Sequence, residues 1–156
     1  MGIPSGYTSG QVVQAVPIPS GVVQVVSATS ATVTTTTSTS YVTSGLSASI
    51  TPSKASSKVM IFVSGAFYNN AANAEIYATV FRGTVAGTNL ATSSTHGFAS
   101  VFPVTLQTPA FNFLDSPNTT SAQTYTVGIR SAGGSATAAW AYQGGTTVIT
   151  LMEVLA

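Results

Sequence analysis

The amino-acid sequence predicts an all-β chain, with an antiparallel β-sandwich at 22–156 and an extended arm before it at 1–21. Three observations support this prediction. Short apolar runs are separated by Gly, Asn, Ser and Pro at spacings that suit a sandwich. Apolar residues alternate with small or polar ones along several of these runs. No stretch has the periodicity of an amphipathic helix.

The first 21 residues predict an extended arm. Pro4, Pro17 and Pro19, together with several glycines, exclude a helix and interrupt any long strand pairing. The stretch is more apolar than a disordered tail, so we expect it to dock on another surface. Packing of the arm on its own domain is the alternative. The residues expected to make the contact are Ile3, Tyr7, Val12, Val13, Val16 and Ile18.

The remaining chain divides into short runs that favour strands. Alternation is clearest at 59–67, where every second residue from Val59 is apolar or glycine. Glycine pairs at 133–134 and 144–145 each separate two such runs and predict turns. The predicted strands are 22–28, 31–37, 41–50, 58–68, 75–82, 88–92, 98–107, 110–114, 123–131, 136–142 and 146–154.

Residues 32–41 read TVTTTTSTSY, a tract that is either disordered or a strand. Threonine is β-branched and favours strands, and the tract contains neither Gly nor Pro. We therefore interpret 31–37 as a surface strand and 38–40 as the turn of a hairpin. Cross-strand Thr pairs would hold that hairpin together.

Two predicted strands, 58–68 and 75–82, carry apolar residues on both faces. Met60 and Phe62 are examples in the first of them. Such strands either lie centrally in a two-sheet core or turn one face to a neighbouring subunit, and we expect both cases.

Charged residues make up only 4% of the chain, against about 25% in ordinary soluble domains. A net charge of +1 on so few groups leaves little repulsion between copies, so we expect an oligomer. No cluster of Lys and Arg is present to bind nucleic acid. The longest wholly apolar run, 59–63, is far shorter than the ~20 residues of a membrane span.

The sequence offers little for catalysis, metal binding or a cofactor. His96 is the single histidine, and Glu75, Asp115 and Glu153 are the acids. We expect no enzyme, no cofactor and no metal site, because a metal site needs several clustered ligands. Asp115 is interpreted as a turn residue that accepts hydrogen bonds from backbone amides ahead of Pro117.

The aromatic residues are expected mostly in the core, since a sandwich needs such bulk. A sugar-binding groove is the alternative for some of them. The candidates are Phe98, Phe102, Phe111, Phe113, Trp140 and Tyr142.

Several segments together resemble a module that recurs in virion proteins of tailed bacteriophages. They are YVTSGLSASITP at 41–52, SSKVMI at 56–61, FLDSPNTT at 113–120 and TLME at 150–153. The resemblance covers roughly 22–156. It implies a trimeric β-sandwich or jelly-roll domain on the virion surface, without catalytic residues. Such modules often end fibre proteins and bind receptors there.

The sequence departs from the fibre arrangement because Met1 and a short arm precede the domain, without a shaft repeat. This arrangement favours a capsid decoration, or cement, protein on the outer capsid surface. The expected partners are two further copies of the chain in a homotrimer and the phage major capsid protein. The alternative is a tail-fibre tip that recognises a host surface glycan.

Overall fold

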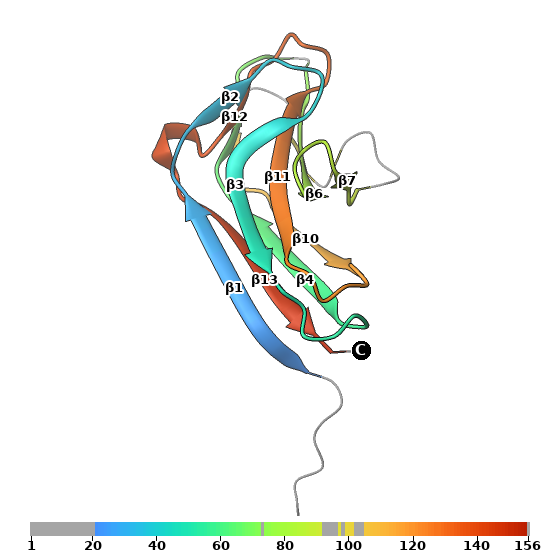
Figure 1. Cartoon of the computed structure of the whole chain (residues 1–156). Helices are drawn as coiled ribbons and strands as arrows, with labels where there is room; N and C mark the ends of the chain where they lie inside the picture. Colours follow the sequence, from blue (N-terminus) through green and yellow to red (C-terminus); the bar gives the residue numbers. More distant parts are fainter. Residues whose placement is uncertain (1–20, 73, 92–96, 98, 102–104, 156) are drawn as a thin grey trace, which may run out of the picture.

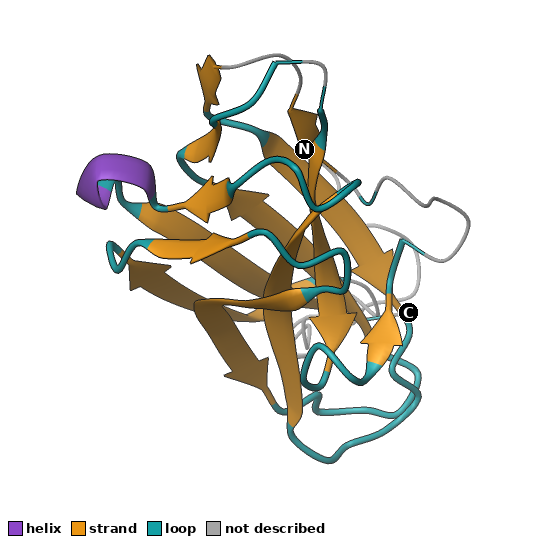
Figure 2. Cartoon of the chain, turned by 90° about the horizontal axis from the view of Figure 1, so that it is seen from above, coloured by secondary structure: helices purple, strands orange, loops and turns teal. Residues whose placement is uncertain are grey.

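The structure is a computed structural model that describes residues 21–155 except 73, 92–96, 98 and 102–104. All strand pairs among these residues are antiparallel, which confirms the predicted all-β class. Within the described residues, one helical turn, η1 (Tyr142–Gly144), interrupts the strands (Figure 2). The strands are β1 (Val22–Ser30), β2 (Thr34–Thr36), β3 (Val42–Ile50), β4 (Lys58–Ser64), β5 (Phe67–Asn69), β6 (Ile76–Arg82), β7 (Thr88–Asn89), β8 (Ala99–Val101), β9 (Thr105–Gln107), β10 (Ala110–Asp115), β11 (Gln123–Ser131), β12 (Ala138–Trp140) and β13 (Thr147–Val154).

One layer of the sandwich is a long sheet with a bend across its middle. Its lower half has the strand order β1-β13-β4-β10, and its upper half has the order β2-β12-β5-β9. The two halves are separate four-stranded sheets, and each lower strand is joined to its upper counterpart by a junction at 31–33, 65–66, 108–109 or 141–146, the last of which contains η1 (Figure 1). We call the two halves together the bent sheet.

The second layer, the facing sheet, has the order β3-β11-β6-β7, with β8 also paired to β6. Along the chain, the strand pairs β1–β2, β4–β5, β9–β10 and β12–β13 of the bent sheet alternate with β3, with β6 to β8, and with β11 of the facing sheet. This alternation between two antiparallel sheets gives the domain a jelly-roll-like topology.

The core fills the space between the two layers. Alternate residues of each strand point inward, as at Val59, Ile61 and Val63 of β4, which are all buried. Trp140 is the largest fully buried side chain, and its ring meets Phe67 edge-on with a centroid separation of 5.4 Å. These two rings lie at the bend, where the upper half of the sheet meets the core.

Most predicted strands are confirmed, but two of them divide between sheets. The predicted strand 58–68 becomes β4 and β5, which pair with different strands on either side of 65–66. The predicted strand 98–107 likewise contains β8 of the facing sheet and β9 of the bent sheet. Alternation predicts extended backbone but does not show where a strand changes sheets.

The Thr-rich tract contains a strand, as predicted, but the prediction that this strand forms a hairpin with the next one is wrong. Thr34, Thr35 and Thr36 form β2, whose partner is β12 rather than the strand that follows it. The Thr34 hydroxyl donates a 2.9 Å hydrogen bond to the Ser44 backbone oxygen, so side chains, not a ladder, link β2 to β3. The apolar partner Trp140 lies opposite Thr34 and supplies the burial that a second Thr strand could not.

Candidate interaction surface

The acidic residues of the described chain take part in structural contacts. The described residues contain no group of three or more His, Cys, Asp or Glu side chains that could hold a metal ion. His96, Phe98 and Phe102 lie outside the residues that the structure describes. The same part of the chain contains no helix with the length and apolar character needed to span a membrane.

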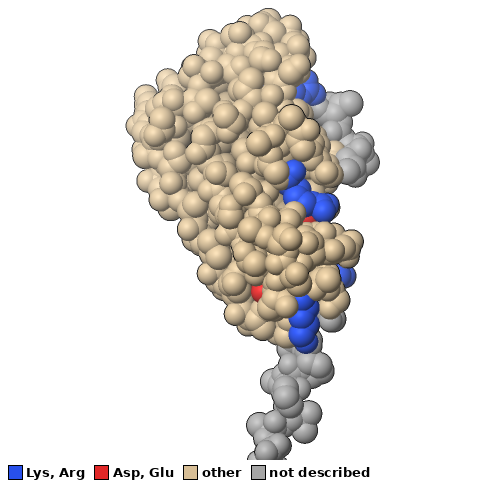
Figure 3. Space-filling view, viewed as in Figure 1, with Lys and Arg blue, Asp and Glu red and all other residues tan. Residues whose placement is uncertain are grey.

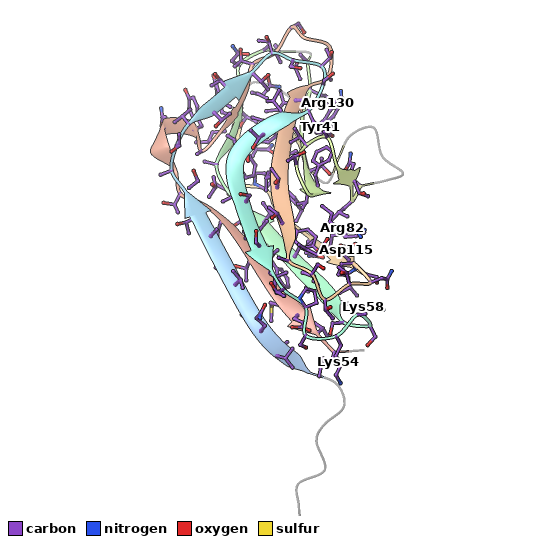
Figure 4. The ribbon with its side chains drawn as sticks, viewed as in Figure 1. Tyr41, Lys54, Lys58, Arg82, Asp115 and Arg130 are labelled. Carbon is purple, nitrogen blue, oxygen red and sulfur yellow. The ribbon has the colours of Figure 1, made fainter. Side chains whose placement is uncertain are left out.

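Asp115 forms a buried ion pair rather than the expected contacts with backbone amides. It is the last residue of β10, and it is only 4% exposed. Arg82 Nε lies 3.1 Å from Asp115 Oδ2, and the Tyr125 hydroxyl donates a 2.8 Å hydrogen bond to the same oxygen (Figure 4). Burial and this hydrogen bond raise the pKa of Tyr125. The turn itself follows Asp115, where Pro117 is buried and Asn118 has a φ of 53°.

Glu153 is a second buried carboxylate, on the inner face of β13. Its Oε1 accepts hydrogen bonds from the Ser53 amide at 2.7 Å and from the Ser53 hydroxyl at 2.6 Å. Burial opposes ionisation, but the hydrogen bonds outweigh it and hold the pKa of Glu153 below its usual value. The carboxylate thereby fixes the loop after β3 to the end of the bent sheet.

Replacing Glu153 with glutamine should lower the free energy of unfolding by about 1.5 kcal/mol at pH 7, because charge-assisted hydrogen bonds become neutral ones. Since the folded-state pKa is lowered, the stabilisation is present above the unfolded pKa of about 4.3 and is lost as the pH falls. Urea unfolding of both chains at pH 7 and at pH 3 measures this. An equal difference at the two pH values would contradict the assignment.

A third group of charges lies at the upper end of the facing sheet. The Arg130 guanidinium lies 4.6 Å from the ring centroid of Tyr77 and 5.2 Å from that of Tyr41. The Tyr77 hydroxyl donates a 2.5 Å hydrogen bond to Glu75. Burial and this bond raise the pKa of Tyr77 to about 12. The phenol is therefore a neutral, structural group at physiological pH.

The outer face of the bent sheet is the most unusual surface of the molecule. Every large hydrophobic residue that is exposed in the described chain lies on this sheet or in its junctions. These residues are Val22, Val23, Val25, Val33, Phe62, Leu106 and Leu114. Single exposed apolar residues need no explanation, but a set confined to one sheet indicates an interaction surface.

Strand register brings these residues together in the lower half. Val25, Met152, Met60 and Leu114 lie opposite one another in turn across β1, β13, β4 and β10. Val25 is 57% exposed and Leu114 42%, while the two methionines between them are half-buried. The result is an apolar row across all four strands.

The next row along the sheet contains Phe62, 42% exposed, between Asn112 and Thr150. Phe62 borders a groove of about 260 Å³ whose outward-facing lining residues include Ala110, Asn112 and Val148. Uncharged polar groups complete the surface, and Ser27 and Thr150 bond each other through their hydroxyls at 2.8 Å. A partner could therefore bury these two rows without removing a charge from water.

The bent sheet carries almost no charge on its outer face. Its charged residues are Lys58, Asp115 and Glu153. Both acids point into the core, and Lys58 lies on the outer side at the start of β4. The four Lys and Arg residues of the chain lie along one side of the molecule, and the opposite side of the view shows none (Figure 3). Burial within the chain confirms the central position expected for β6, and the contact of β4 with a neighbouring subunit stays a prediction. All of β6 except Arg82 is buried within the chain, whereas β4 leaves Phe62 exposed.

The aromatic residues outside the core include one stacked pair. Trp140 is buried and Phe111 is nearly so, as expected for core residues. Tyr68 and Tyr142 are half-buried and stack with ring centroids 4.1 Å apart. Tyr142 lies between Ala141 and Gln143, and both neighbours have positive φ angles near 55°. Such strain in non-glycine residues is costly and is often retained where it presents a side chain.

The six apolar arm residues proposed to dock on a partner lie outside the described residues.

The sequence predicted the apolar outer face of the bent sheet only in part. Alternation identified the two-sided strand at 58–68, but the row from Val25 to Leu114 depends on long-range register. The scarcity of charge in 22–30 and 110–114 was the available signal.

No family model matches the chain, and no curated protein sequence matches it. Among solved structures, the VP2 subviral particle of infectious bursal disease virus aligns at a TM-score of 0.49 with 15% identity, over 84% of this chain and 38% of that chain. The viral particle described as T13 aligns at 0.47 with 14% identity, over 85% of this chain and 38% of the other. This chain thus spans less than two fifths of the proteins it matches. At TM-scores below 0.5 we draw no conclusion about this chain from the likeness.

Proposed function

We propose that this chain is a virion structural protein, a homotrimeric decoration protein on the outer capsid surface of a tailed bacteriophage. The observation that carries the proposal is the apolar outer face of the bent sheet, where Lys58 at the start of β4 is the one charged residue among the described strand residues. Such a face suits permanent burial against identical copies, because little like charge is brought together there. The resemblance of residues 41–52, 56–61, 113–120 and 150–153 to tailed-phage virion modules supports the phage assignment.

In this proposal the arm attaches the trimer to the major capsid protein. It contributes Ile3, Tyr7, Val12, Val13, Val16 and Ile18, and no charged residue. Burial of apolar side chains yields about 25 cal/mol per Å², part of which is spent on ordering the arm. Because no ion pairs take part, attachment should depend only weakly on salt concentration.

Removing residues 1–20 should abolish binding to capsids. The truncation keeps Gly21, whose backbone oxygen accepts a 3.0 Å hydrogen bond from Leu155, so the sandwich should stay folded. Co-sedimentation with capsids of the parent phage, stripped of this protein, measures binding. Circular dichroism checks the fold. Unaltered binding by a folded truncated chain would remove the arm from the proposal.

A tail-fibre tip that binds a host surface glycan is the second candidate. The stacked pair of Tyr68 and Tyr142 beside strained backbone favours it, because aromatic faces are suited to sugar rings. The number of chains per purified particle separates the two candidates. Hundreds of copies indicate decoration, whereas a few tens or fewer indicate a tail fibre.

A further inference from the structure

β1 is an edge strand without the usual protection. It lies at the end of the order β1-β13-β4-β10, and in the described part of the chain it pairs only with β13. Its nine residues contain neither a charge nor a proline. Natural edge strands are normally shortened, charged or covered, because their free N–H and C=O groups bind other strands. We therefore expect another strand to pair with this edge.

The sequence just before β1 repeats the start of β1. Residues 12–16 read VVQAV and residues 22–26 read VVQVV, so the two segments differ only at Ala15 and Val25. In β1 this pattern places Gln24 and Val26 on the half-buried side and Val25 on the exposed side. A segment with the same alternation fits beside β1 as one more strand of the same sheet.

The link between the two segments directs residues 12–16 away from their own β1. Pro17 and Pro19 fix their own φ angles, and the residue before each proline is restricted to extended backbone. The sequence between 16 and 19 therefore resists a reversal of the chain direction. Gly21 is held by Leu155, so only Ser20 is left to reverse the chain. A tight hairpin back onto β1 is disfavoured.

We propose that residues 12–16 of a second copy of this chain add as a strand to the free edge of β1. Each copy gives one strand and receives one, which closes a ring in a trimer. Val12, Val13 and Val16 then contact a neighbouring copy, which narrows the capsid contact of the proposed function to Ile3, Tyr7 and Ile18. The inference needs self-association from the proposed function, but it does not need the capsid.

The register of this pairing follows from the repeat. VVQVV reads the same in both directions, so pairing centred on the glutamines places Gln14 opposite Gln24 for parallel and for antiparallel strands. Valine or alanine then lies opposite valine at the other positions. Directly opposite residues in an antiparallel pair have Cα atoms about 4.5–5.5 Å apart, close enough for a disulfide.

The chain has no cysteine, so any disulfide that forms must join cysteines introduced by mutation. Chains with Gln14→Cys are mixed with chains of different mass carrying Gln24→Cys, and the mixture is oxidised with diamide. We expect a covalent dimer of one chain of each kind as the main product on a non-reducing gel. The control replaces Gln24→Cys by Val25→Cys, one residue away on the opposite face, and its yield should be at least tenfold lower.

The double variant Gln14→Cys with Gln24→Cys separates exchange from a hairpin. We expect covalent trimers. A product that stays monomeric with an internal disulfide would overturn the assignment to a second copy, as would equal yields from the Val25→Cys control. Removing residues 1–10 takes away Ile3 and Tyr7 of the six apolar arm residues and keeps residues 12–16. Cross-linking should survive this truncation even if capsid binding is lost, so a failure here is distinguishable from a failure of the proposed function.

Discussion

Replacing Asp115 with alanine is expected to lower the free energy of unfolding by about 3 kcal/mol. The change removes a carboxylate that is 4% exposed and leaves two groups behind. Arg82 loses its 3.1 Å ion pair, and the fully buried Tyr125 hydroxyl loses its acceptor. An unpaired buried hydroxyl alone costs about 1–3 kcal/mol. Because the Arg82 side chain is 29% exposed, water can partly solvate it, which keeps the loss at the lower end for a broken buried pair.

Two further variants test whether the ion pair is responsible. Tyr125→Phe removes only the hydroxyl and should cost about 1 kcal/mol, and Asp115→Asn should lie between the two because its amide oxygen still accepts hydrogen bonds. Chemical unfolding at pH 7 measures all three chains. If Asp115→Ala and Tyr125→Phe were equally destabilising, the contact with Arg82 would contribute nothing.

Local sequence pattern was sufficient for the strands. The alternation from Val59 to Phe67 is present in the structure, with the odd-numbered residues buried. The glycine pairs at 133–134 and 144–145 separate β11 from β12 and β12 from β13. Side-chain period and turn chemistry depend only on neighbouring residues, so one sequence can reveal them.

Contacts between distant segments were not foreseen. Asp115 pairs with Arg82 from another strand, and β2 pairs with β12 about a hundred residues away. A short polar strand is compatible with several partners, so its pattern alone selects none. One signal was available for the ion pair. In a chain with four basic and three acidic residues, an acid and an arginine at the ends of apolar strands are natural partners.

The bend was not predicted either, because it depends on contacts between distant segments. One residue in the sequence nevertheless indicates its position. Gly65 occupies a buried position in the alternating series, where a valine or isoleucine would be expected. A glycine inside a strand pattern often marks a close approach of another group. Here the backbone passes against Thr147 and Trp140, and the Gly65 amide donates a 3.4 Å hydrogen bond to the Pro109 oxygen across the junctions.

Replacing Gly65 with alanine is therefore expected to cost about 3 kcal/mol, at the upper end for overpacking in a core. An added Cβ would lie 2.4 Å from Thr147 Cγ2, 2.7 Å from Thr147 Cβ and 3.1 Å from Trp140 Cζ2. Neither neighbour can move freely. Trp140 is fully buried, and the Thr147 hydroxyl donates a 2.9 Å hydrogen bond to the Ser30 oxygen in the adjacent strand.

The control is Gly133→Ala, because a Cβ there has no atom within 4 Å, and its stability should change by less than about 0.5 kcal/mol. Thr147→Ser keeps the hydroxyl but removes Cγ2, the atom in closest conflict. Combined with Gly65→Ala it should recover part of the loss in a double-mutant cycle. If the two changes were simply additive, the contact between the strands at the bend would not be the cause. The bend determines how the upper and lower halves of the outer face meet. The Gly65→Ala chain should therefore also self-associate less, and light scattering measures this.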